Sequence, residues 1–296
     1  MQIKTIRKNI ENKMSEWITT IDDEGLRNSV RENLLVSGGC IASMLLNEDV
    51  RDYDVYLQAQ DVLVNLVKYY TKDIIEDVKV LDGRERERLL YENDCGGKSV
   101  FSISVNNLKS NQVKLFFNDS LVGVRINEKK EIKEKEYIPL YFSPNCISLS
   151  NKVQVVLRFN GPPKEIHKNY DFVHATNYYT FKEGLVTNKA ALESLLTKQL
   201  KYQGSLYPLT SILRMKKFVK RNWNINAGEV LKIMFQISEL NMSDPNILEE
   251  QLTGIDVAYF AKVIEILRGV DIKITSPYLN EIINRVFEQA EENRIE

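Results

Sequence analysis

The apolar positions of the chain recur at helical spacing near its start and then change to short runs. Residues 5–35 predict a helix, because Ile10, Met14 and Trp17 would share one face of it. A Ser-Gly-Gly triplet at 37–39 ends that pattern, since glycine disfavours continued helix. A helical lead-in therefore precedes whatever follows these glycines.

The central part of the chain alternates predicted helices and strands. The expected helices cover 40–46 and 59–76, and the expected strands cover 54–57, 99–105, 113–117, 146–149, 153–159 and 170–174. From about residue 186 the pattern turns helical to the end, with stops at glycine and proline. We therefore predict an α+β fold with a mixed sheet and flanking helices in residues 1–190, followed by an all-helical domain in residues 191–296.

Composition narrows the class of protein. The chain has 296 residues with 43% hydrophobic side chains, which is enough to build a core. No run of about 18 apolar residues occurs, and the start has no secretory pattern, so we expect a cytoplasmic protein and no membrane partner. Cys40, Cys95 and Cys146 lack the spacing of a zinc site or a disulfide framework and predict reduced thiols. His167 and His174 are too few for most zinc chemistry and are interpreted as structural.

The net charge of −1 hides an uneven distribution. Residues 198–221 carry basic side chains and no acidic ones, whereas residues 222–296 are acidic overall. The basic side chains are Lys198, Lys201, Arg214, Lys216, Lys217, Lys220 and Arg221. Such a segment either forms a solvated helix face or meets phosphate groups.

The residues that indicate chemistry lie between positions 37 and 57. Asp52 and Asp54 would point to one face of a strand, and two adjacent carboxylates are costly unless a divalent cation lies between them. Gly38 and Gly39 would open a short helix whose backbone N–H groups approach a phosphate closely. One short unit therefore combines a phosphate cradle with a carboxylate pair that binds metal. The alternative is an ordinary glycine linker followed by a surface turn.

Gly38-Gly39, a helix, and Asp52-x-Asp54 followed by apolar residues resemble the signature of the nucleotidyltransferase superfamily. That superfamily includes DNA polymerase β, poly(A) polymerases and CCA-adding enzymes. Residues 147–179 and 201–256 also resemble uncharacterised nucleotidyltransferase-like proteins of bacteriophages. The resemblance implies a nucleotidyltransferase-type sheet and template-independent transfer of a nucleotide.

The resemblance also implies a third acid on a later strand. Asp171 in Asn-Tyr-Asp-Phe-Val fits best, because it follows the long strand predicted over 153–159. Asp119 and Asp94 are the alternatives, and both look like turn residues. Asp52, Asp54 and Asp171 are thus the predicted catalytic residues and the predicted ligands of two Mg²⁺ ions, with Mn²⁺ as an alternative ion.

Further residues are assigned to the nucleoside triphosphate by the same resemblance. Ser37, Gly38 and Gly39 would hold the β and γ phosphates. The predicted helical half would add Lys198, Lys201 and Ser205 to the same phosphates.

The segment from Arg214 to Ala227 has two interpretations. Its end, Arg-Asn-Trp-Asn-Ile-Asn-Ala, is similar to an element that holds the nucleotide sugar in CCA-adding enzymes, although Asn222 replaces the acid. Alternatively it is a basic helix that follows a nucleic-acid backbone, with Arg214, Lys216, Lys217, Lys220 and Arg221 as the contacts. Trp223 would then stack on a base or only fill the core, and the same holds for Tyr178 and Tyr179.

Three functions of different class follow. The first is Mg²⁺-dependent transfer of a nucleotide from an NTP to the 3′ end of an RNA, such as tRNA. The second is the same transfer to a protein or a small molecule, as in AMPylation. The third is a nucleic-acid-binding protein that kept the fold and lost the activity; the intact acids argue against it, because an unused acid cluster destabilises a fold.

Overall fold

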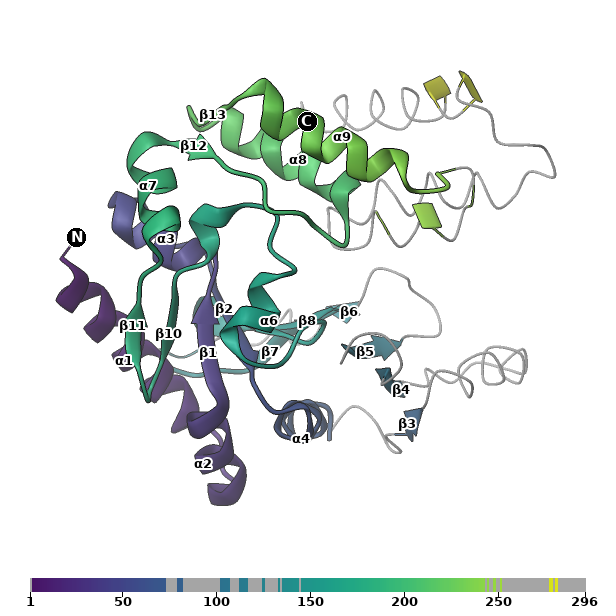
Figure 1. Ribbon diagram of the computed structural model, residues 1–296. Helices are drawn as coiled ribbons and strands as arrows, with labels where there is room; N and C mark the ends of the chain where they lie inside the picture. The colour runs from purple at the N-terminus through teal and green to yellow at the C-terminus, as the bar shows by residue number, and fades with distance from the viewer. Residues whose placement is uncertain are drawn as a thin grey trace, which may run out of the picture. The chain divides into compact units, whose positions relative to one another are not determined.

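The structure is a computed structural model (Figure 1), and it describes residues 2–72, 79–81, 102–106, 112–116, 124–125, 133, 135–143, 145–242, 244, 247–248, 251, 277–278 and 280–281. The chain divides into two compact units, Met1–Thr197 and Lys198–Glu296. Asp94, Cys95, Asp119 and most of the charged run 128–136 lie outside the described residues. Within the described residues, no helix is long and apolar enough to cross a membrane.

The first unit contains most of the described elements. Its helices are α1 (Ile3–Ile18), α2 (Glu24–Asn33), α3 (Gly39–Leu46), α4 (Gln60–Thr71), α6 (Pro163–His167) and α7 (Lys189–Thr197), with 3₁₀ turns η1 (Ser150–Lys152) and η2 (Val173–Ala175). Its strands are β1 (Leu34–Ser37), β2 (Tyr53–Leu57), β3 (Lys79–Leu81), β4 (Ser102–Asn106), β5 (Gln112–Phe116), β6 (Val124–Arg125), β7 (Pro139–Phe142), β8 (Cys146–Leu149), β9 (Val153–Val156), β10 (Tyr178–Thr180) and β11 (Gly184–Val186).

The main sheet has the strand order β11-β10-β1-β2-β9-β8-β7-β6. Strands β2 and β9 pair in parallel, and the other described pairs of this sheet are antiparallel. The strands β3, β4 and β5 form a separate sheet. The predicted α+β fold with a mixed sheet and flanking helices is therefore confirmed.

One face of the main sheet is covered by the N-terminal helices. Ile6, Ile10, Met14 and Trp17 of α1 are fully buried, because their spacing puts them on one side of the helix. They share a core with alternate residues of the central strands, such as Val36, and with α3 and α4. Burial of these side chains fixes which face of each strand points inward.

The opposite face carries a smaller apolar cluster under α6. Leu35 of β1 and Tyr56 of β2 pack there against Ile166 of α6, with Val156 of β9 beside them. In Figure 1 the short helix α6 lies in front of the main sheet, beside β1, which agrees with this packing. Residues that alternate with the main core along β1, β2 and β9 therefore face α6.

Several predicted elements need correction. The helix expected over 5–35 is two helices, and its last residues belong to strand β1. The strand expected over 170–174 is instead a single bridge at Phe172 followed by the turn η2. The predicted strand 153–159 ends at Val156, and β10 and β11 were not expected. Apolar runs of three or four residues carry too little periodicity to separate a strand from a helix end.

The described elements of the second unit are β12 (Gln199–Leu200), α8 (Pro208–Val219), β13 (Asn224–Ile225) and α9 (Ala227–Ser238). Strands β12 and β13 pair in parallel. The side chain of Asn226 caps α9 by accepting a hydrogen bond from Glu229 N at 2.9 Å. Among the described residues of this unit, α8 and α9 are each twelve residues long, and the two short strands differ from the expectation of an all-helical domain.

Candidate active site

A row of side chains crosses five strands on the face that α6 covers. Ser37 of β1 lies opposite Asp54 of β2 on one side and opposite Tyr178 of β10 on the other. Asp54 in turn lies beside Gln154 of β9, which lies opposite Ser148 of β8. Their strand neighbours on either side point into the main core, so these five side chains share the other face. We call Tyr178, Ser37, Asp54, Gln154 and Ser148 the polar row.

The turn after β1 brings the glycine pair against the polar row. Gly38 has φ of 93° and ψ of −146°, a conformation that only glycine adopts readily. A Cβ on Gly38 would lie 3.1 Å from Oδ2 of Asp54, so the turn depends on glycine for space as well. Gly39 begins α3 and is exposed, and a Cβ on it would meet nothing within 4 Å. The first turn of α3 is therefore open beside a carboxylate, and its backbone N–H groups suit an anion.

The hydroxyl of Ser37 is bound to groups of the protein. The side chain is fully buried, and its Oγ donates to the carbonyl of Asn177 at 2.8 Å. The same Oγ lies 2.9 Å from Nε2 of His167. The hydroxyl therefore fixes the turn that presents Gly38 and Gly39, and a contact of Ser37 with a triphosphate stays a prediction. The carbonyl of Ala175 accepts from Gly38 N at 3.2 Å and adds to this fixation.

His167 at the end of α6 and Tyr170 in the loop after it place two rings beside the turn. His167 lies 5.1 Å from Tyr170 and 5.8 Å from Tyr178 between ring centres. The Tyr170 hydroxyl would lie 3.5 Å from a Cβ on Gly38. Burial lowers the pKa of His167 to about 4, so the ring is neutral at physiological pH. Burial, and then the charge of Asp54, raise the pKa of Tyr170, so its hydroxyl keeps its proton.

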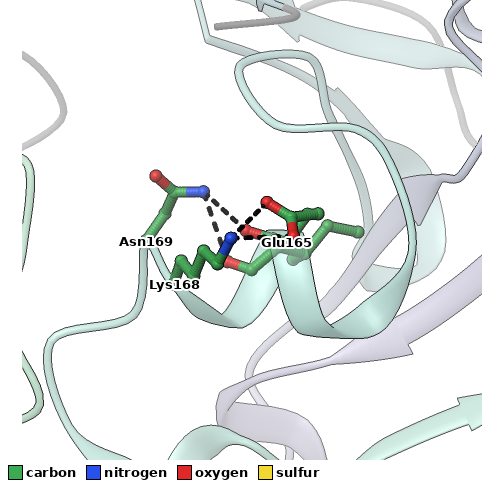
Figure 2. Close-up of polar contacts among 4 residues, drawn as sticks. Glu165, Lys168 and Asn169 are labelled. Carbon is green, nitrogen blue, oxygen red and sulfur yellow. Dashed lines mark hydrogen bonds and ion pairs between the residues drawn. The ribbon is translucent and has the colours of Figure 1, made fainter.

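Contacts at the end of α6 hold these rings in place (Figure 2). Lys168 Nζ lies 2.8 Å from both carboxylate oxygens of Glu165, and the amide of Asn169 donates to the carbonyl of Glu165 at 3.0 Å. The Asn169 amide also reaches the carbonyl of Ile166 at 3.5 Å. These bonds satisfy carbonyls at the helix end and fix the direction in which the chain leaves toward Tyr170. The ion pair itself is exposed and adds little stability.

Asp52 and Asp54 lie close to the first turn of α3. Asp54 is on β2 and half-buried, whereas Asp52 directly precedes the strand and is exposed. Burial raises the pKa of the Cys40 thiol, and the negative charge of Asp54 and, to a lesser extent, of Asp52 raise it further. Both carboxylates therefore act on the helix that Gly39 begins. The thiol stays protonated, which fits the prediction of a reduced, unreactive cysteine.

The donor set beside Gly39 fits Mg²⁺. Mg²⁺ prefers oxygen ligands and is usually held by one or two carboxylates, several waters and substrate phosphates. Asp52 and Asp54 supply two carboxylates next to the open turn of α3. Waters and the phosphates of a substrate would supply the remaining oxygen ligands of such an ion.

The predicted trio of acids is not assembled. Among the residues that the structure describes, no three His, Cys, Asp or Glu side chains form a group that could hold a metal ion. Asp171 lies in the loop between α6 and η2 rather than on a strand, and it is 4% exposed. A role for Asp171 as a ligand stays a prediction.

The other predicted site residues belong to the second unit. Ser205 is buried, and its Oγ accepts from Tyr207 N at 3.0 Å. Lys198 and Lys201 are half-buried. Lys216 and Lys217 in the last turn of α8 are exposed, as are Lys220 and Arg221 directly after it, and Arg214 is half-buried. Their contacts with a nucleotide or a nucleic acid stay predictions.

Burial separates the aromatic side chains that fill the core from those that could stack on a base. Trp223 is 3% exposed and packs edge-to-face on Phe218 at 5.4 Å, so it fills the core of its unit. Tyr179 is also buried, within the main core. Tyr178 remains half-exposed on the polar row. His174 is buried and stacked on Phe172, as expected for a structural histidine.

Gln154, His167 and Tyr170 were missed as site residues. Gln154 reaches the site only through the parallel pairing of β2 with β9, which the sequence does not reveal. Two observations in the sequence pointed toward α6: Pro163 at a helix start and the nearby Tyr-Asp-Phe run.

The family model described as "Gabija anti-defense 2 family protein" (Gad2) matches residues 8–198, which is more than half of the chain. The chain therefore belongs to this family. The matched range includes the polar row, the glycine pair and α6. No curated protein matches the chain.

Solved structures of CCA-adding enzymes are similar to the chain. The enzyme of Thermotoga maritima complexed with tRNA is 14% identical, with a TM-score of 0.37, over 95% of this chain and 62% of that one. The enzyme of Bacillus stearothermophilus in complex with CTP is 12% identical, with a TM-score of 0.37, over 81% and 50%. A CCA-adding enzyme with ATP is 12% identical, with a TM-score of 0.39, over 97% and 52%. The chain thus spans half to about three fifths of the length of these structures.

Proposed function

We propose that the protein is a Mg²⁺-dependent nucleotidyltransferase that moves an NMP from an NTP to a hydroxyl group and releases pyrophosphate. One observation carries the proposal: the Gly38 turn begins α3 directly against the carboxylate of Asp54, whose Oδ2 would lie 3.1 Å from a Cβ on Gly38. A helix N-terminus that suits phosphate and a carboxylate that suits a metal ion are therefore neighbours, which supports the proposal.

Different groups of the chain bind the phosphates, hold the metal ion and fix the turn. The N–H groups of the first turn of α3 bind the phosphates, and the open space at Gly39 lets a phosphate approach the backbone. Asp52 and Asp54 hold Mg²⁺, which when bound neutralises charge on the phosphate oxygens. Ser37 and His167 keep the turn in place from behind, through their 2.9 Å contact. Asp171 is the predicted additional acid near the attacking hydroxyl, and its contribution is testable separately.

Residues 198–221, which we call the basic segment, carry basic and no acidic side chains. This segment favours the 3′ end of an RNA, such as tRNA, as the acceptor. Lys216, Lys217, Lys220 and Arg221 are exposed together at the end of α8, as a phosphate backbone requires. Lys198, Lys201 and Ser205 would add phosphate contacts from the same unit.

Family membership favours a second acceptor. The family is described as acting against Gabija, so a protein of that defence is a natural target for nucleotide transfer. The reaction at the metal would be the same, and the basic segment would have no nucleic-acid role. Either acceptor would be met in the cytoplasm of a host cell, where we place the protein.

The test uses NTPs labelled at the α phosphate, Mg²⁺ and the full chain. Total tRNA and the purified proteins of the Gabija defence serve as acceptors in separate reactions. Label on RNA supports the first acceptor, and label on a Gabija protein supports the second. Tight RNA binding without label on either would favour the inactive, nucleic-acid-binding alternative. The Asp52→Ala variant should give no label while melting like the wild type.

A further inference from the structure

Gln154 is the strand neighbour of Asp54 on the side away from Ser37. The two residues are Cα partners in the parallel pair of β2 and β9, so their side chains leave the sheet next to each other. Val153 and Val155, on either side of Gln154, are buried in the main core. Gln154 therefore points to the same face as Asp54, in the middle of the polar row.

The orientation of the Gln154 amide is fixed by β8. Its Nε2 lies 2.9 Å from Sγ of Cys146 and donates to it. Cys146 is itself held by the hydroxyl of Ser143, 3.1 Å from the sulfur. With the amide nitrogen turned to Cys146, the amide oxygen faces away from that sulfur. The structure thus presents a neutral oxygen donor in the strand next to a carboxylate.

A neutral donor changes the charge of the metal site. Asp52 and Asp54 together balance the charge of one Mg²⁺, whereas a third carboxylate would leave an excess negative charge facing an incoming triphosphate. Affinity for a divalent cation rises with the number of charged ligands. A site of two carboxylates and one amide therefore holds the free ion weakly and is completed by phosphate oxygens.

We propose that the amide oxygen of Gln154 is the third protein ligand of the metal bound by Asp52 and Asp54, so that the ion is held firmly only together with the NTP. The inference rests on the proposed function, because it concerns the same metal. Cys146 acts here as a positioning residue that orients the amide.

The experiment measures Mn²⁺ binding to the full chain by isothermal titration, first alone and then with a non-hydrolysable ATP analogue. Gln154→Glu should tighten Mn²⁺ binding in the absence of nucleotide by about tenfold or more, because it adds a charged ligand. Gln154→Leu should weaken binding of Mn²⁺ with the analogue by about tenfold, a loss of the size seen when a metal site's surroundings are changed. Gln58→Glu is the matched control: it adds the same charge at another half-buried glutamine, four residues beyond Asp54, and should leave both affinities nearly unchanged.

The outcomes separate this inference from the proposed function. If Asp54→Asn binds Mn²⁺ as the wild type does, the metal site of the proposed function is wrong. If Asp54→Asn loses Mn²⁺ while Gln154→Glu matches Gln58→Glu and Gln154→Leu matches the wild type, only the role of Gln154 is overturned. Thermal melting of each variant checks that the fold is intact, and Gln154→Asn, which moves the amide back by one methylene, replaces Gln154→Leu if that variant does not fold.

Discussion

The polar row of the first unit and the basic segment of the second unit present polar groups in opposite ways. In the row, Ser37 is buried and its hydroxyl is fixed by both a carbonyl and His167. In the basic segment, Lys217 and Lys220 extend into solvent at a helix end. Preorganised groups of the first kind suit one defined chemical step, whereas mobile charges of the second kind suit a long, variable polyanion. This difference is the reason for proposing the chemical step in the first unit and acceptor binding in the second.

The largest expected effect on activity comes from a substitution in the polar row. Asp54→Asn should lower nucleotidyl transfer by about 10³-fold or more, because a bound metal supplies several kcal/mol of stabilisation to the transition state. Asp49→Asn, which changes an exposed acid of the same unit, should keep nearly full activity. Initial rates with saturating NTP and Mg²⁺ measure both. An equal loss of activity in the two variants would contradict a specific role of Asp54 in the transfer.

Substitution of each of the two glycines should separate an effect on stability from an effect on NTP binding. Gly38→Ala should destabilise the first unit by about 1–3 kcal/mol, because the backbone is in a glycine-only conformation and the new Cβ meets Asp54. Gly39→Ala should leave stability nearly unchanged, since its Cβ meets nothing within 4 Å, but should weaken NTP binding. Urea unfolding and NTP titrations on both variants measure this. Full NTP affinity in a folded Gly39→Ala variant would contradict a phosphate at the start of α3.

The buried contact between Ser37 and His167 should make the free energy of unfolding depend on pH. The pKa of His167 is lowered to about 4 by burial, whereas the unfolded chain's histidine titrates near its ordinary value. Between these values the unfolded state binds a proton that the folded state does not, so the free energy of unfolding falls as pH decreases from about 6.5 to 4. His167→Gln keeps a hydrogen-bond donor to Ser37 and should flatten this slope. Urea unfolding at several pH values would contradict the account if the two slopes were equal.

The smallest effect is expected on the basic segment. Lys217→Glu with Lys220→Glu should weaken RNA binding and lower the slope of log K against log salt by about one to two, roughly 0.7–0.9 for each lost phosphate contact. Lys182→Glu with Lys189→Glu changes two exposed lysines of the first unit and serves as the control. Nucleotide transfer to a small acceptor should be unchanged in both. Identical salt dependence in the two double variants would exclude the segment from the RNA interface.

The sequence predicted the local units of the site and not their assembly. The helix after Gly39 and the strands at Asp54 and Cys146 could be predicted, because glycine placement and apolar runs are local signals. The register that places Gln154 beside Asp54 could not, since β2 and β9 are separated by 100 residues between these two partners. Asp171 was expected on a strand because Phe172 and Val173 are apolar, but those residues enter a 3₁₀ turn.

The central claim is transfer of the NTP's α phosphate at the carboxylates beside Gly38. The most direct measurement compares ATP labelled at the α phosphate with ATP labelled at the γ phosphate, using the full chain, Mg²⁺ and an acceptor. The account predicts label on the acceptor only from the α position, with the γ label recovered in pyrophosphate, and neither product with Asp54→Asn. Label on the acceptor from the γ position, or hydrolysis to free phosphate alone, would contradict it.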